Sequence, residues 1–117
     1  MKHAQSKQAR EARTAENSIL LTFGSCYGFF DMENEIFETI DKDDSDLWVW
    51  LGDVTYLDYN SFWGSAPQTP ANVKYRYDKT KGAQGYADLN ATSKIIGVWD
   101  DHDFGENDGG KEFELKH

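Results

Sequence analysis

The stretch Leu47-Trp48-Val49-Trp50-Leu51-Gly52-Asp53 decides the fold, because it joins a continuous apolar run to a glycine and a carboxylate. An unbroken apolar run of this length is typical of a strand that is buried on both faces of a parallel sheet. Two further runs have the same character, and one of them ends at Gly24. We therefore predict three strands, over residues 19–23, 47–51 and 95–99.

Helical segments separate these strands. Asp31 is a suitable N-cap, and Glu33 and Glu35 favour the first turn of a helix. That helix would bury an apolar stripe of Met32, Ile36, Phe37 and Ile40.

A long loop and a second helical segment follow the middle strand. Residues 55–70 are rich in aromatic residues, glycine and proline, which predicts a long loop over a pocket. Residues 72–90 predict one or two short helices, interrupted at Lys81-Gly82. Alternating strands and helices predict an α/β fold with about three mainly parallel strands and right-handed crossover helices.

The charge of the chain restricts its partners. The 117 residues fit one domain or part of one, and the net charge is −9. Residues 1–17 carry a balance of +2, which leaves −11 for residues 18–117. Phosphate backbones would be repelled by this acidic body, so we expect no duplex nucleic-acid binding, whereas a cation would be attracted. We predict a frayed helix or a disordered polar tail over residues 1–17 and the folded unit over residues 18–117.

The sequence also gives an expectation for the cellular compartment of the protein. A single cysteine excludes an internal disulfide and gives no sign of an oxidising environment. No run of 18 apolar residues exists, and residues 1–17 lack the apolar centre of a signal peptide. We expect a soluble intracellular protein without a membrane contact. The acidic run of Asp41, Asp43, Asp44 and Asp46 is interpreted as a solvated turn between a helix and a strand.

Reactive side chains follow all three predicted strands. Cys26 comes after the first, Asp53 and Tyr56 after the second, and four ionisable residues, 100–103, after the third. In parallel α/β sheets ligands bind beyond the carboxyl ends of the strands, so these side chains should meet at one edge. Crowded carboxylates stay ionised near neutral pH only beside a cation or several hydrogen-bond donors, which points to a metal site.

Each of these residues also has a structural explanation. Cys26 could be a small core residue, and Tyr56 could close the core with its hydroxyl on a carbonyl. His102 could be an ordinary surface histidine, although acidic neighbours would raise its pKa and suit it to proton donation. The carboxylates could form a solvated turn.

Three motifs, taken together, resemble those of the PhoD-like alkaline phosphatases, a branch of the calcineurin-like metallophosphoesterases. They are Phe23-Gly24-Ser25-Cys26-Tyr27, Leu51-Gly52-Asp53-Val54-Thr55-Tyr56 and Trp99-Asp100-Asp101-His102-Asp103-Phe104-Gly105-Glu106-Asn107-Asp108. The resemblance covers roughly residues 19–113. It implies a partial αββα sandwich, with residues 18–117 as the N-terminal half of the catalytic domain.

The resemblance also implies a function. The expected reaction is metal-dependent hydrolysis of phosphate mono- or diesters at a dinuclear site that holds iron and calcium or another divalent ion. By resemblance, Cys26 is a thiolate ligand of iron and Tyr56 a phenolate ligand. Asp53 resembles the carboxylate that bridges the two metals, and Asp101 resembles a ligand of the second metal.

The resemblance also implies that His102 and Asp103 are the catalytic residues. His102 resembles the residue that contacts the phosphate or the leaving oxygen, and Asp103 the residue that orients this imidazole. Asp100 and Asn107 match the family pattern without a specific role, as less certain metal ligands.

The family takes its other metal ligands from later strands, which residues 1–117 do not include. We therefore expect an incomplete fragment with weak or no activity. We also expect it to self-associate through a sheet face that the second half of the sandwich would cover.

Two other classes of function stay open. Asp101, Asp103 and Glu112 match positions 1, 3 and 12 of an EF-hand calcium loop, but Gly105 and Glu106 depart from that motif at positions 5 and 6. A thiol hydrolase could use Cys26 as nucleophile and His102 as base. Cys26 lacks the arginine of a Cys-x5-Arg loop, because Met32 stands at that position.

Overall fold

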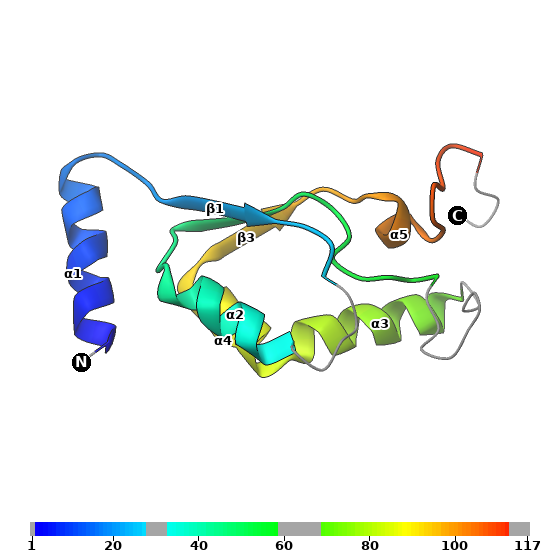
Figure 1. The fold of residues 1–117 in the computed structure, drawn as a ribbon, viewed down its shortest axis with the longest axis horizontal. Coiled ribbons are helices and arrows are strands. Elements are labelled where there is room, and N and C mark those ends of the chain that lie inside the picture. The colour runs from blue at the N-terminus through cyan, green and yellow to red at the C-terminus, as the bar shows by residue number, and fades with distance from the viewer. Residues whose placement is uncertain (1, 28–32, 59–68, 113–117) are drawn as a thin grey trace.

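Three short parallel strands form the sheet in the computed structural model, which describes residues 2–27, 33–58 and 69–112 (Figure 1). The strands are β1 (Leu21–Gly24), β2 (Leu47–Trp50) and β3 (Lys94–Gly97), in the order β1-β2-β3. Phe23 lies beside Val49, and Val49 lies beside Ile96. This arrangement confirms the predicted partial α/β fold, with strand bounds within one or two residues of those expected.

The described helices lie before, between and after the strands. They are α1 (Lys2–Ala15), α2 (Glu33–Lys42), α3 (Pro70–Gly82), α4 (Gln84–Thr92) and the short α5 (Asp101–Phe104). The predicted interruption near Lys81-Gly82 is confirmed, because α3 ends there. Asp31, Met32 and most of the predicted loop over residues 55–70 lie outside the described residues.

An aromatic core joins β2 to the helices on one face of the sheet. Trp48 and Trp50 are two positions apart in β2, so both lie on this face, where α2 and α4 lie (Figure 1). The ring of Trp50 is stacked on Tyr86 of α4 at a centroid distance of 6.4 Å, and Tyr86 meets Phe37 of α2 edge-on at 5.3 Å. Phe37 and Leu89 are fully buried. Burial of these large apolar side chains is the main stabilisation of the unit.

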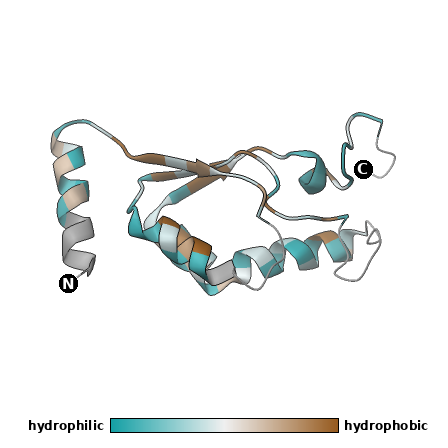
Figure 2. Ribbon diagram, viewed as in Figure 1, coloured by the Kyte–Doolittle hydropathy of each residue, from teal (hydrophilic) through white to brown (hydrophobic). Residues whose placement is uncertain are grey.

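The other face of the sheet is apolar and exposed. Figure 2 shows hydrophobic residues along the strands, and no described element covers them on the side away from α2 and α4. We expected the strands to be buried on both faces. Among the described residues, only the face toward α2 and α4 is covered. The exposed side chains are Leu21, Phe23, Leu51, Ile96 and Val98.

Helix α1 stands at the opposite end of the sheet from α5 (Figure 1) and is held by two arginines. Arg13 donates from Nε to Asp46 Oδ2 at 2.9 Å, and Arg10 Nε lies 3.0 Å from Asp44 Oδ1. Asp46 also accepts the backbone N–H of Leu20 at 2.8 Å. The acidic turn is thus partly buried in ion pairs, a correction to the solvated turn expected, and residues 2–15 are helical.

No described helix combines the length and the apolar character that a membrane crossing requires.

Candidate metal centre

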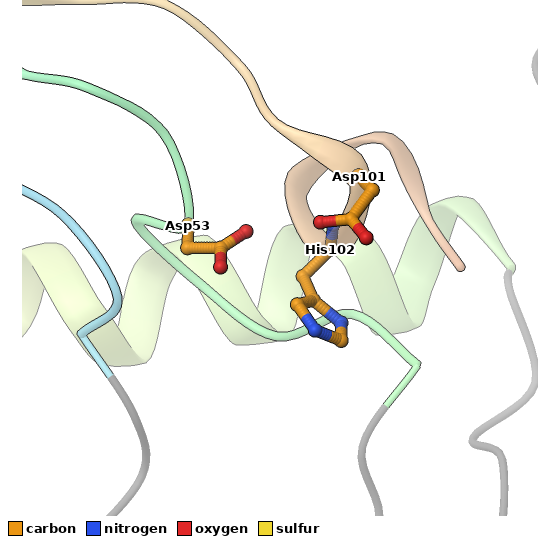
Figure 3. Close-up of side chains that lie close together, drawn as sticks. All are labelled: Asp53, Asp101 and His102. Atoms are coloured by element: carbon orange, nitrogen blue, oxygen red, sulfur yellow. The ribbon is translucent and has the colours of Figure 1, made fainter. Parts of the chain in front are cut away.

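The carboxyl ends of β2 and β3 bring Asp53, Asp101 and His102 together (Figure 3). One potential ligand atom from each side chain lies within 4.8 Å of the others. Asp53 comes from the turn after β2, whereas Asp101 and His102 belong to α5. Asp53 is buried, at 6% exposure, and its φ angle of 53° turns the chain sharply after Gly52. The predicted meeting of strand-end residues is therefore present in the fold.

Asp53 is the centre of this group. Its Oδ2 accepts from the Tyr56 hydroxyl at 3.1 Å and lies 3.6 Å from Cys26 Sγ. Its Oδ1 is buried and has no hydrogen-bond partner among the described residues. A buried carboxylate oxygen without a donor is unfavourable, and a cation at this point would satisfy it. The oxygen, nitrogen and sulfur atoms around Asp53 suit a transition metal together with a harder cation.

The environment of Tyr56 keeps its phenol protonated in the metal-free site. Burial raises the pKa of Tyr56, and the neighbouring Asp53 carboxylate and Cys26 raise it further. A phenolate therefore requires a cation close enough to offset these charges.

The carboxylate of Asp101 is held in its charged form. The backbone N–H of Asp108 lowers the pKa of Asp101 most, and the N–H of His102, donated at 2.9 Å, adds to this effect against partial burial. Asp101 therefore presents a charged carboxylate beside Asp53 and His102, with each of its oxygens also accepting a backbone N–H.

His102 contacts a carboxylate that the sequence analysis did not indicate. Its Nδ1 lies 2.8 Å from Asp58 Oδ1, and its ring packs against Tyr56 at a centroid distance of 4.2 Å. Partial burial opposes the charged imidazole, but the hydrogen bond and charge of Asp58, with the charges of Asp101 and Asp53, raise the pKa of His102. The signal available in the sequence was an acidic residue two positions after Tyr56.

Asp103 has a structural position and does not contact the ring of His102 in the way expected. Its Oδ1 accepts the N–H of Thr55 at 3.0 Å, and its Oδ2 accepts the N–H of Asp100 at 3.2 Å. Burial raises the pKa of Asp103, although these N–H groups favour its charged form. Asp103 therefore connects the loop after β2, here called the β2 loop (residues 51–58), to the start of α5.

Asp100 and Asn107 stand apart from the metal group. The side chain of Asp100 caps α5 by accepting the N–H of Asp101 at 3.0 Å. Asn107 is exposed, and its side chain donates to Asp108. Neither amide nor carboxylate joins the described group of three.

The two other classes of site find less support in this geometry. An EF-hand calcium loop would begin at Asp101, but Asp101–Phe104 form helix α5 and Asp103 is buried. A thiol hydrolase needs Cys26 beside His102, but the thiol lies against Asp53 and the Nδ1 of the ring against Asp58.

Comparisons with known proteins give a structural likeness. No protein-family model matches the chain, and no curated protein matches it in sequence. Among solved structures the chain is similar to PhoD, with a TM-score of 0.64 and 20% identity over 84% of this chain. The match covers 22% of the PhoD chain, so the present chain spans about a fifth of that length. At this identity the likeness shows the fold.

Proposed function

We propose that this chain carries part of a metal-dependent phosphoesterase site, built on the PhoD-like fold at the carboxyl ends of β1 and β2 and on α5. The observation that carries the proposal is the buried Asp53 carboxylate, which has one unpartnered oxygen and lies beside Asp101 and His102. Its Oδ2 is next to the thiol of Cys26 and the phenol of Tyr56. This set of donors is what the sequence resemblance requires.

The residues would divide between two metals. Cys26, Tyr56 and Asp53 would hold iron, because thiolate and phenolate are electron-rich ligands that suit an oxidising ion. Asp53 and Asp101 would share a harder ion such as calcium, which prefers carboxylate oxygen. Bound metals would supply a water of lowered pKa and positive charge near the phosphoryl oxygens.

The protein groups would act around that centre. His102, positioned beside the two carboxylates and raised in pKa, would donate a proton or hydrogen bond to a phosphate or leaving oxygen. A phosphate mono- or diester is the substrate class that the resemblance suggests. The net charge of −9 would repel such an anion unless bound metals offset it.

Metal binding tests this proposal directly. The purified chain, loaded with ferric iron and calcium and then desalted, should retain iron and show a visible charge-transfer band. Cys26→Ser and Tyr56→Phe should each weaken or shift this band, and Asp53→Asn should reduce the iron retained. Asp88→Asn, an exposed substitution on α4, is the matched control and should change neither. Absence of retained iron, or a band that both ligand substitutions leave unchanged, would overturn the proposal.

Activity gives a second measurement. The loaded chain should hydrolyse bis-p-nitrophenyl phosphate slowly, below about 1 s⁻¹, the low end of ordinary enzymes. The reason is that the family in the resemblance takes further ligands from later strands, so the residues present would supply only part of the centre that acts on the attacking and leaving oxygens. The Asp53→Asn variant should lose even this turnover.

A further inference from the structure

Asp58 lies between His102 Nδ1 and the backbone N–H of Asn107. Its Oδ1 is 2.8 Å from His102 Nδ1, and its Oδ2 accepts the backbone N–H of Asn107 at 3.0 Å. The Asp58 and His102 side chains are 14% and 15% exposed, so the contact is largely shielded from water. The carboxylate therefore links the β2 loop to both α5 and the turn that follows it.

Other contacts fix the imidazole in the same orientation. The ring packs against Tyr56, and the backbone carbonyl of His102 accepts the N–H of Leu57 at 3.2 Å. Asp103, the residue expected to orient the ring, has both oxygens on backbone N–H groups. Asp58 is thus the carboxylate that the ring meets at its Nδ1.

We propose that Asp58 is the positioning residue of His102. Its carboxylate accepts a hydrogen bond from Nδ1–H, which leaves Nε2 as the ring nitrogen available to the group of Asp53 and Asp101. A carboxylate can only accept, so a neutral imidazole in this contact must carry its single proton on Nδ1. Nε2 then keeps its lone pair, and in the imidazolium Nε2 carries the proton that can be donated. This inference rests on the proposed function for its catalytic meaning.

The second contact of Asp58 makes an isosteric test possible. In Asp58→Asn, a single amide oxygen faces two groups that both need an acceptor, the N–H of Asn107 and Nδ1–H. The backbone N–H cannot lose its proton, so it should take the oxygen and leave the amide NH₂ against Nδ1. Nδ1 must then become an acceptor, which moves the ring proton to Nε2. Asp58→Glu keeps two acceptor oxygens and should preserve the Nδ1–H form.

The experiment measures the ¹⁵N chemical shifts of the His102 ring in the metal-free protein, at a pH where the ring is neutral. The wild-type ring should favour the Nδ1–H tautomer by roughly tenfold or more, the ratio that a hydrogen bond to a charged group supplies. Asp58→Asn should invert this preference and Asp58→Glu should restore it. Asp108→Asn removes a nearby negative charge without touching the ring, and it should leave the tautomer unchanged.

The outcomes separate this inference from the proposed function. A wild-type ring in the Nε2–H form, or an Asp58→Asn ring that keeps the wild-type tautomer, would overturn the role of Asp58, whatever metal the site binds. The wild-type measurement decides the point even where a variant does not fold. A wild-type Nδ1–H ring in a protein that retains no iron would support the positioning contact and reject the phosphoesterase.

Discussion

Several residues at the candidate site have the left-handed backbone conformation. Cys26, Gly52 and Asp53 have φ angles of 59°, 109° and 53°. Cys26 and Gly52 lie two positions after the last residue of a strand, and Asp53 lies three positions after it. Outside glycine this conformation is unfavourable by about 1 to 3 kcal/mol and persists where surrounding contacts fix it. The strained turns bring Cys26 and Asp53 against each other, so the strain belongs to the geometry of the site.

Gly52 is the residue on which this turn depends. A Cβ at Gly52 would lie 2.4 Å from the Cβ of Asp100, and its φ of 109° disfavours any other residue. Gly52→Ala should therefore lower the free energy of unfolding by about 3 kcal/mol, from strain and overpacking together. Urea unfolding measures the change. Gly82→Ala, where a Cβ meets nothing within 4 Å, is the control and should be neutral or stabilising by up to about 1 kcal/mol. Equal effects of the two substitutions would contradict this account.

Asp103 should matter for stability more than for orientation of His102. Asp103→Ala removes the acceptor of the buried Thr55 N–H and of the partly buried Asp100 N–H, which should cost about 3 kcal/mol. Chemical denaturation of the metal-free chain tests this value. Asp88→Ala, on the exposed surface of α4, should change stability by less than about 0.5 kcal/mol. A small effect at Asp103 would mean that water replaces the lost acceptor.

Some site residues could be predicted from the sequence because they directly follow apolar runs. Asp53 and Asp101 lie within one or a few residues of a strand end, and the parallel sheet fixes where such ends meet. Asp58 could not be predicted in the same way. Its contact with His102 depends on the path of the β2 loop over several residues, which no apolar pattern specifies. The contacts of Asp103 with the N–H groups of Thr55 and Asp100 also depend on loop geometry, so the sequence does not show that this carboxylate binds backbone and not the His102 ring.

At the scale of elements, the continuous apolar runs predicted the strands, and Lys81-Gly82 predicted the break between α3 and α4. The apolar runs are short, and the glycines in and after them allow close packing: Gly24 leaves room for the indole of Trp48, and Gly97 for the Cβ and backbone of Trp50. The contact of α1 could not be predicted, because it depends on two arginines with no apolar stripe beside them. Ion pairs between a helix and a distant turn leave no periodic signal in a sequence.

The turn that holds α1 should be sensitive to acid. The N–H of Leu20 lowers the pKa of Asp46 below its ordinary value of 3.8, and Arg13, with the charge of Arg10, lowers it further. Asp46 therefore stabilises the folded state above its unfolded pKa, and this contribution is lost as the pH falls through the lowered folded value. Asp44, the other carboxylate that faces these arginines, lies in the same turn.

Asp46→Asn should flatten this acid dependence. Between about pH 5 and pH 2 the thermal midpoint of the wild type should fall more than that of the variant, because the variant lacks the titrating group. Thermal unfolding by circular dichroism at several pH values gives the comparison. Asp43→Asn, an exposed change in the same turn, should keep the wild-type slope. Parallel pH profiles for wild type and Asp46→Asn would reject the role of Asp46.

At the scale of the whole molecule, the two faces of the sheet differ in a way that governs association. Phe23 and Val98 are 64% and 60% exposed on the face away from α2 and α4. The parallel register aligns Phe23, Val49 and Ile96 across all three strands, so the apolar surface is continuous. Monomers seldom expose apolar patches of more than a few hundred Å². In the sandwich expected from the resemblance, a second sheet covers this face.

We therefore predict that the chain, studied as these 117 residues, self-associates or binds a hydrophobic dye through this face, despite its net charge of −9. The double substitution Phe23→Thr and Ile96→Thr keeps strand propensity but removes two apolar side chains from the centre of the patch, so dye binding and association should both decrease. Tyr75→Thr, an exposed aromatic change on α3, is the control and should leave both unchanged. Sedimentation velocity and dye fluorescence measure the two effects. A monomer that unfolds cooperatively and binds no dye would show that this face is satisfied in solution, and that the chain needs no second sheet to complete its fold.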